Sequence, residues 1–242
     1  MALRYAVGAR THVGLVRKVN EDSILCHPAG GLWAVADGMG GHANGQWAAM
    51  EVTAGLAATG LSAGASIDSD CERLADALAD ANDRIVATAA GAGATMGATI
   101  VALRIVGDRF ACLWAGDSRV YRLRGAALRQ ITRDHSQVGE LVEAGILTPE
   151  QAEKHPLANV ITRAVGVATD LALDVVEDRV LAGDAFLLCS DGLTRCVADA
   201  RIAALAAAGT ADAACQALLD ACLAEGAPDN VSLILVRCEA AE

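Results

Sequence analysis

Aromatic side chains are scarce in this chain of 242 residues, where phenylalanine, tryptophan and tyrosine together make up 3%. Hydrophobic residues still reach 54%, so alanine, valine, leucine and isoleucine must fill the core. The length suits one large domain or two small ones. No stretch has the length and continuous apolarity of a membrane span, and the first residues lack a basic segment followed by an apolar one. We therefore expect a soluble, cytoplasmic protein with no signal peptide and no membrane partner.

Positive charge is also in short supply. Nineteen lysine and arginine residues face 30 aspartate and glutamate residues, which gives a formal net charge of −11. Because nucleic-acid-binding proteins usually present a basic face, this balance predicts no nucleic-acid partner. The eight cysteines show neither a CxxC pair nor a Cys/His zinc spacing. Several lie in apolar runs such as FACLWA, so we expect all eight to be reduced core residues.

Strand-like and helix-like segments alternate along the chain. The predicted strands are 31–36, three within 97–128 that are joined by turns at 107–109 and 116–118, 173–181, 185–190 and 230–238, and the predicted helical regions are 45–61, 70–90 and 199–225. Strands in meander order with helices grouped between them predict an α+β fold, in which helices cover antiparallel sheets. We find no repeat or linker and expect a single domain over 1–242, with the polar segment 134–165 as an insertion.

Four aspartates follow or precede apolar strands: Asp37, Asp117, Asp191 and Asp229. Each one alone is typical of a hairpin turn, because Asp-Gly and Gly-Asp-Ser are common turn sequences. Four together favour a shared site, since a sheet gathers its strand ends. Clustered carboxylates repel one another unless a cation or protons compensate, and an oxygen-only ligand set suits Mg²⁺ or Mn²⁺ rather than Zn²⁺. The sequence therefore predicts a site for two ions, roughly 3.5–4 Å apart, that acts on a phosphoryl group.

The segment RKVNEDS, residues 17–23, places an arginine shortly before two acids. Arg17 is suited to hold a phosphate with two hydrogen bonds, while Glu21 and Asp22 orient waters around the metal ions. Taken alone, the same run is typical of a solvated surface. The glycine-rich loop at 37–45 is not a phosphate-binding Walker loop, because no Gly-Lys-Ser/Thr follows it.

Together these segments resemble the PP2C-type metal-dependent Ser/Thr protein phosphatases in their compact bacterial form. The matching blocks, in family order over residues 8–237, are VRKVNEDS, AVADGMGGHANG, GATIVAL, WAGDSRVYRLR, ITRDHS, LANVITRAVG, FLLCSDGL and DNVSLILV. The resemblance implies a four-layer α-β-β-α sandwich of two antiparallel sheets flanked by helices. It also implies Mn²⁺- or Mg²⁺-dependent hydrolysis of phosphoserine and phosphothreonine on proteins, by a metal-activated water that attacks phosphorus.

The resemblance further implies a set of metal ligands. Asp37 would bridge two ions, and the Gly38 carbonyl would bind one of them. Asp191 and Asp229 would complete the shell of the first ion. Asp117, with Asp191, would hold a third ion as in bacterial relatives.

Other residues match further parts of the family pattern. Arg17 matches the phosphate-binding arginine, Glu21 and Asp22 match the acids behind the metal ions, and 134–165 matches a flap linked to substrate choice. Met39 stands where the eukaryotic pattern has a histidine proposed as general acid, and a thioether donates no proton. The acid is then His42 or a water at the metal ions, of which we favour the water.

Two other classes fit the motifs less well. A GDS-type serine esterase would use Ser118 as nucleophile, but it needs an Asp-x-x-His late in the chain, where the last histidine is His155. A non-catalytic relative that only binds phosphoproteins would have lost a metal aspartate, and all four are present. We expect a monomer that acts on phosphorylated proteins, with a bacterial Ser/Thr kinase as candidate partner.

Overall fold

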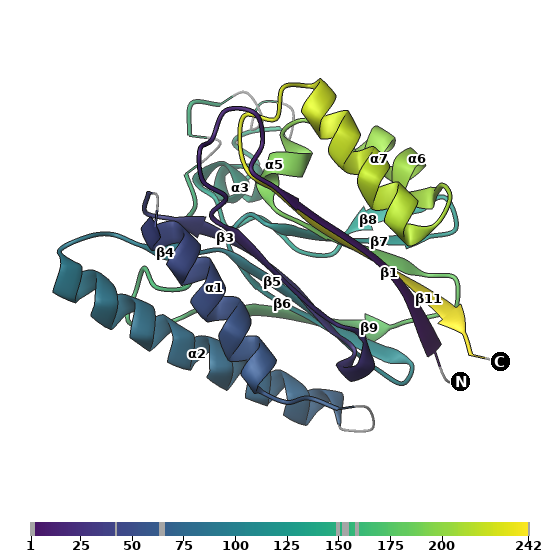
Figure 1. The fold of residues 1–242 in the computed structure, drawn as a ribbon, viewed down its shortest axis with the longest axis horizontal. Coiled ribbons are helices and arrows are strands. Elements are labelled where there is room, and N and C mark those ends of the chain that lie inside the picture. The colour runs from purple at the N-terminus through teal and green to yellow at the C-terminus, as the bar shows by residue number, and fades with distance from the viewer. Residues whose placement is uncertain are drawn as a thin grey trace.

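Two antiparallel sheets pack face to face in this computed structural model, and helices cover the outer face of each sheet (Figure 1). The structure describes residues 3–41, 43–62, 66–148, 151, 155–157 and 160–241. The two chain ends lie next to each other at one end of the sandwich, on the right in Figure 1. The predicted α+β, four-layer α-β-β-α fold is confirmed.

The first sheet has the strand order β1-β11-β10-β7-β8. Its strands are β1 (Leu3–His12), β7 (Arg119–Arg124), β8 (Ala127–Gln130), β10 (Ala185–Cys189) and β11 (Val231–Ala240). Strand β1 pairs with β11 along its whole length, from Leu3 opposite Ala240 to His12 opposite Val231. The first and last strands of the chain are thus neighbours in one sheet.

The second sheet has the order β2-β3-β5-β6-β9, with β4 paired to the end of β3. Its strands are β2 (Asp22–His27), β3 (Leu32–Met39), β4 (Gly97–Ala98), β5 (Ile100–Val106), β6 (Arg109–Ala115) and β9 (Asp174–Arg179), and a short 3-10 helix, η1 (Pro28–Gly30), joins β2 to β3. The predicted meander is wrong, because the chain passes from one sheet to the other several times, for example between β6 and β7.

The described helices are α1 (Ala43–Ala58), α2 (Ile67–Ala92), α3 (Gln137–Glu143), α5 (Asp191–Thr194), α6 (Asp199–Ala207) and α7 (Ala211–Ala224). Helices α1 and α2 cover the second sheet, whereas α5, α6 and α7 cover the first (Figure 1). Helix α2 buries Leu74, Leu78 and Ile85 on one face, as expected for an amphipathic surface helix. In the described residues, no helix is both long enough and apolar enough for a membrane crossing.

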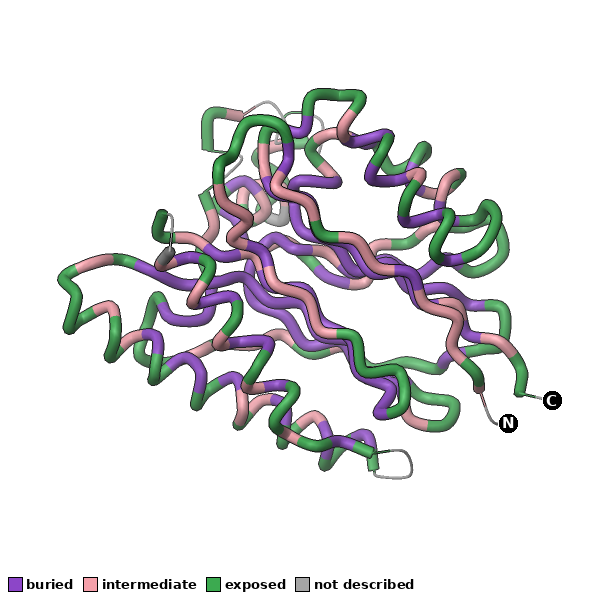
Figure 2. Tube along the Cα trace, in the orientation of Figure 1, coloured by how far each residue is buried: buried purple, intermediate pink, exposed green. Residues whose placement is uncertain are grey.

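Three apolar clusters fill the three interfaces between the four layers, and the buried segments follow the strands (Figure 2). Strand β3 contributes to two of them. Its Ala34 and Ala36 face the helices, while Trp33 and Val35 pack between the sheets. Successive side chains of a strand point to opposite faces, so a strand buried on both faces has a continuous apolar sequence. Small side chains on the helix-facing side let α1 lie close to the sheet.

Several predictions from sequence need correction. Strands β1 and β2 were not predicted, because they lie at the sheet edges and are mostly half-buried, which leaves no sustained apolar pattern. All eight cysteines are free, as expected, but Cys26 is exposed and Cys71 and Cys196 are only half-buried. The prediction that all eight lie in the core is therefore wrong. An edge strand or helix boundary exposes a thiol even next to apolar residues.

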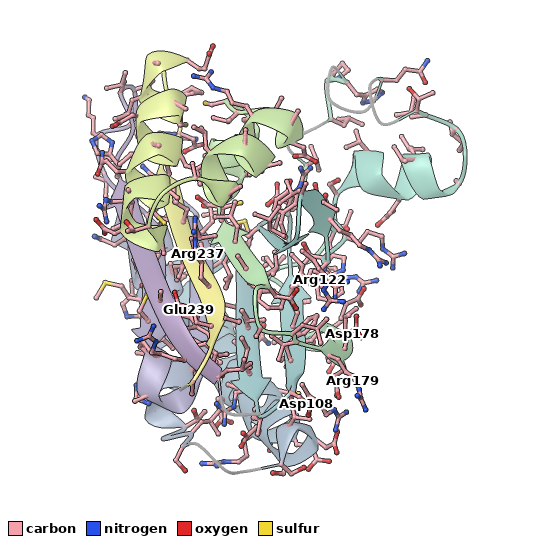
Figure 3. The ribbon with its side chains drawn as sticks, turned by 90° about the vertical axis from the view of Figure 1, so that its right-hand side faces the viewer. Asp108, Arg122, Asp178, Arg179, Arg237 and Glu239 are labelled. Atoms are coloured by element: carbon pink, nitrogen blue, oxygen red, sulfur yellow. The ribbon has the colours of Figure 1, made fainter. Side chains whose placement is uncertain are left out.

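A charged pair joins the two sheets at one side of the molecule. Arg122 of β7 and Asp178 of β9 lie side by side in Figure 3, with 2.9 Å between Nη1 and Oδ2.

Helix α3, in the segment 134–165, stands out from the sandwich in the same view. Hydrogen bonds from Gln137 N to Val160 O and from Thr162 N to His135 O, 2.9 and 2.8 Å long, hold the base of this segment. Parts of the segment, 149–150, 152–154 and 158–159, lie outside the described residues.

Candidate metal centre

Two of the predicted site residues face each other across neighbouring strands. The register of β2 and β3 places Asp22 directly opposite Asp37, an arrangement of like charges that costs stability. Asp37 lies inside β3 rather than in a turn, so the hairpin interpretation of its Asp-Gly sequence is wrong. A pair of acids that the sheet itself disfavours indicates a functional role.

Asp191 and Asp229 come to the same place from the other sheet. Asp191 is the first residue of α5, two residues after the end of β10, and Asp229 lies two residues before β11. The hydroxyl of Ser190 donates a hydrogen bond of 2.9 Å to Oδ2 of Asp22. Since Ser190 follows β10 and Asp22 begins β2, the carboxylates collect between the two sheets at one end of the sandwich.

Asp117 joins this group through the segment that crosses from β6 to β7. These strands belong to different sheets, so Gly116–Ser118 is not the hairpin turn that we predicted. The Ser118 hydroxyl lies 2.7 Å from the hydroxyl of Thr99. The backbone N–H of Thr99 in turn donates a hydrogen bond of 2.8 Å to the backbone oxygen of Asp37. Ser118 is buried and bonded in this way, which argues against the nucleophile of a serine esterase.

Close backbone approach explains the glycines that follow two of the aspartates. A Cβ atom on Gly38 would collide with the carbonyl oxygen of Gly45, at the start of α1, and one on Gly192 would collide with the carbonyl oxygen of Asn230. Neither glycine has a positive φ. Both Asp-Gly pairs therefore serve tight packing around the site.

Burial and mutual repulsion shift the titration of the cluster. Burial, together with the charges of Asp22 and Asp191, raises the pKa of Asp37 well above its ordinary value. Burial raises the pKa of Asp22 to about 7, although hydrogen bonds from Ser232 and Ser190 offset part of the shift. Burial and the charge of Asp191 raise the pKa of Asp117 to about 7. Such shifts are typical of carboxylates that lack a compensating cation.

Two arginines partly supply that compensation. Nη2 of Arg17 lies 2.8 Å from Oδ2 of Asp229, and Nη1 of Arg195 lies 3.3 Å from the same oxygen. Arg195 also forms an ion pair with Asp191, four residues before it. Arg195 was not predicted from the sequence. The available signal is its spacing to Asp191 in SDGLTR, which brings the two onto one side of a helical turn.

The loop that carries Arg17 and Glu21 is held by a second residue that the sequence analysis missed. Asn230 accepts a hydrogen bond of 2.8 Å from Glu21 N and donates to Val13 O and Val19 O at 2.9 and 3.0 Å. Its position directly after Asp229 was the available signal. The Glu21 carboxylate reaches the start of α1, where it closely approaches Gly45.

The residues present fit a divalent cation by their chemistry. The donors are all oxygen atoms, and two buried ones, Oδ1 of Asp22 and Oδ1 of Asp191, have no hydrogen-bond partner. Within the described part of the chain, no three His, Cys, Asp or Glu side chains already form an arrangement that could hold an ion. Asp191 and Asp229 direct oxygens to Arg195 and Arg17 instead. Binding of a cation would require these carboxylates to exchange partners.

The raised pKa values predict an inverted pH dependence of stability in the metal-free protein. Asp22 and Asp117 keep a proton up to about pH 7 when folded but release it near pH 3.8 when unfolded. The folded state thus binds more protons in this interval, so the free energy of unfolding falls as the pH rises from about 4 to about 7. Thermal melting in EDTA across this range measures the effect. Saturating Mn²⁺ should make the melting temperature nearly independent of pH in this range. A melting temperature that does not change with pH in EDTA would contradict the prediction.

Known proteins resemble this chain over nearly its whole length. The model of the protein phosphatase 2C family matches residues 16–228. The serine/threonine protein phosphatase PstP of Mycobacterium tuberculosis is 39% identical over 246 residues, which cover 97% of this chain and 45% of the relative. Protein phosphatase PhpP of Streptococcus pneumoniae is 34% identical over 197 residues, 79% of this chain and 80% of the relative. The chain thus spans about half the length of the mycobacterial relative.

Solved structures show the same likeness. PppA, described as a key regulatory component of T6SS in Pseudomonas aeruginosa, has a TM-score of 0.90 at 42% identity, and the match covers 97% of this chain and 98% of that one. The catalytic domain of PstP in complex with two manganese ions has a TM-score of 0.89 at 34% identity, over 99% and 100% of the two chains. The chain therefore belongs to the protein phosphatase 2C family, as its motifs and fold indicated.

Proposed function

We propose that this chain is a divalent-metal-dependent phosphatase of phosphoserine and phosphothreonine in proteins. The observation that carries the proposal is the cluster of five carboxylates from both sheets (Asp22, Asp37, Asp117, Asp191 and Asp229), which is contacted by the guanidiniums of Arg17 and Arg195. This excess of buried negative charge suits divalent cations. The phosphatase names of the relatives, and the manganese ions in one of them, support the same activity.

Asp37, the Gly38 carbonyl, Asp191 and Asp229 would hold two Mn²⁺ or Mg²⁺ ions, and Asp117 with Asp191 would hold a third. Bound there, such ions would activate a water for attack on phosphorus and neutralise charge on the phosphoryl group. The all-oxygen donor set and the unpartnered Oδ1 of Asp191 support this assignment.

The chain's own side chains would bind and orient the reactants. Arg17 has a half-exposed guanidinium at the mouth of the cluster, where it would hold the phosphate oxygens. We propose that Glu21 and Asp22 orient waters. The unpartnered Oδ1 of Asp22 and the approach of Glu21 to the start of α1 support this role. Because Met39 donates no proton, we propose water as the acid for the leaving group. His42, the alternative acid, lies outside the described residues.

The choice of substrate belongs to the segment 134–165 in this proposal. Contacts that tie this segment to the sandwich lie near its two ends, where Asp134 pairs with Arg119 and Arg163 pairs with Asp174. Loops that stand out from a rigid scaffold often carry recognition. We propose phosphoproteins as substrates, a bacterial Ser/Thr kinase as the opposing enzyme, and a monomeric cytoplasmic protein of one domain. Control of a secretion system is a candidate setting, because the description of PppA names T6SS.

Release of phosphate from a phosphothreonine peptide in the presence of Mn²⁺ tests the proposal. The Arg17→Ala variant is expected to raise KM by about tenfold or more, because a hydrogen bond to a charged group contributes roughly 1.5–3 kcal/mol. Its kcat should change less, since the carboxylates remain. Failure of the unmodified protein to release phosphate would refute the function, and an unchanged KM in the variant would refute the role of Arg17.

A further inference from the structure

Arg195 occupies an unusual place in the carboxylate cluster. It directly follows α5, and its guanidinium is shared between Asp191 and Asp229. The Asp229 oxygen that it contacts is the one that Arg17 contacts from the N-terminal loop. Two guanidiniums from distant parts of the chain therefore meet at a single carboxylate oxygen.

The side chain of Arg195 lies at the mouth of the cluster rather than in its interior. About a third of it (32%) is exposed, compared with 12% of the Asp191 side chain. A cation at this place faces both the carboxylates and the solvent from which a phosphorylated substrate would arrive.

A nearby arginine shows what a purely structural pair looks like in this fold. Arg119 donates three hydrogen bonds, of 2.9, 3.1 and 2.7 Å, to the carboxylate of Asp134 and another of 2.9 Å to the Tyr121 hydroxyl. None of these partners is a predicted metal ligand. Both partners of Arg195, by contrast, are carboxylates that a metal ion would claim.

We propose that Arg195 is a second phosphate-binding residue, which pairs with Asp191 and Asp229 in the metal-free protein and turns to the substrate phosphate once these carboxylates bind cations. The proposal rests on the proposed phosphatase function. A guanidinium and a divalent cation compete for the same carboxylate oxygens, so the binding of one weakens that of the other. The released guanidinium lies next to Arg17, and the planar donors of an arginine suit the bidentate binding of phosphate.

This arrangement predicts opposite effects of Arg195 on two ligands. Replacement by methionine, Arg195→Met, removes a positive charge beside the metal ligands, so Mn²⁺ should bind on the order of tenfold more tightly. The same replacement removes hydrogen-bond donors to phosphate. Inorganic phosphate should then bind to the Mn²⁺-saturated variant on the order of tenfold more weakly. A residue that only supports the fold would not move the two affinities in opposite directions.

Isothermal titration calorimetry measures both affinities without any catalysis, first with Mn²⁺ added to EDTA-treated, desalted protein and then with phosphate added to Mn²⁺-saturated protein. Arg195→Lys keeps the charge, so its Mn²⁺ affinity should stay near that of the unmodified protein while phosphate binding weakens in part. The matched control is Arg201→Met, which breaks an exposed pair between Arg201 of α6 and Glu225, the residue after α7, and should change neither affinity. Thermal melting of each variant confirms that it is folded.

Unchanged affinities in Arg195→Met would show an ordinary surface ion pair and overturn the proposal. A joint loss of both affinities with a lower melting temperature would show a structural role and overturn it as well. The proposed function fails separately, namely if the unmodified protein binds Mn²⁺ but releases no phosphate from phosphopeptides. Should Arg195→Met fail to fold, Arg195→Lys still tests the loss of phosphate affinity against an unchanged affinity for Mn²⁺.

Discussion

Excess EDTA is expected to abolish the hydrolysis of phosphoserine and phosphothreonine peptides by this protein, and Mn²⁺ or Mg²⁺ is expected to restore it. The reason lies in the charge of the site. Without divalent cations, the raised pKa values of Asp22 and Asp117 leave both carboxyls partly protonated near neutral pH, and Arg17 stays paired with Asp229. The negatively charged substrate phosphate would then approach a group of carboxylates that no metal ion neutralises, and Arg17 would not be free to bind it.

Phosphate release, measured with and without chelator on the same preparation, checks this expectation. Zn²⁺ serves as the comparison metal, because a site with only oxygen donors should favour Mn²⁺ or Mg²⁺. Thermal melting gives a reading that is independent of catalysis. At a Mn²⁺ concentration one hundred times Kd, the stability gained is about 2.7 kcal/mol, which corresponds to a rise in Tm of roughly 5–10 °C for a chain of this length. Full turnover in excess EDTA would refute metal dependence.

The Asp37→Asn variant should lose several orders of magnitude in kcat. Asp37 is the proposed ligand of both ions, and it lies where Asp22, Asp117 and Asp191 all add to its negative surroundings. An amide oxygen is a weaker and uncharged ligand, so the affinity for Mn²⁺ should fall as well. The same change removes a buried carboxyl that, without a metal ion, must either take up a proton on folding or repel its neighbours. In EDTA at neutral pH, the variant should therefore melt at a higher temperature than the unmodified protein.

A loss of kcat together with a higher melting temperature would show that Asp37→Asn loses activity without misfolding. The control Asp108→Asn changes an exposed aspartate in the turn between β5 and β6, and it should alter neither kcat nor the melting temperature. If Asp37→Asn kept most of its activity, Asp37 would not be a metal ligand. If it lost activity and also melted at a lower temperature in EDTA, the carboxylate would instead stabilise the fold.

Much of the architecture was predictable because burial leaves a local trace in the sequence. Strand β3 is apolar at every position from Leu32 to Ala36 because both of its faces are covered. Helix α2 repeats its apolar positions at helical spacing because one face is covered. The predicted ligands also left a local trace, since each aspartate follows or precedes such a strand. Edge strands β1 and β2 left none, because half-burial does not require an apolar pattern.

The sequence by itself determined the buried segments that form the middle of the layers, and it determined which acids stand at their ends. Only the tertiary structure decided how these acids meet. The chain crosses between sheets at Gly116–Ser118, the register of β2 and β3 sets Asp22 against Asp37, and the loop before β11 brings Asp229 to Arg17 and Arg195. These contacts join residues up to 212 positions apart. Local propensity acts over a few residues, whereas such pairs depend on the packing of two complete sheets, so no short motif records them.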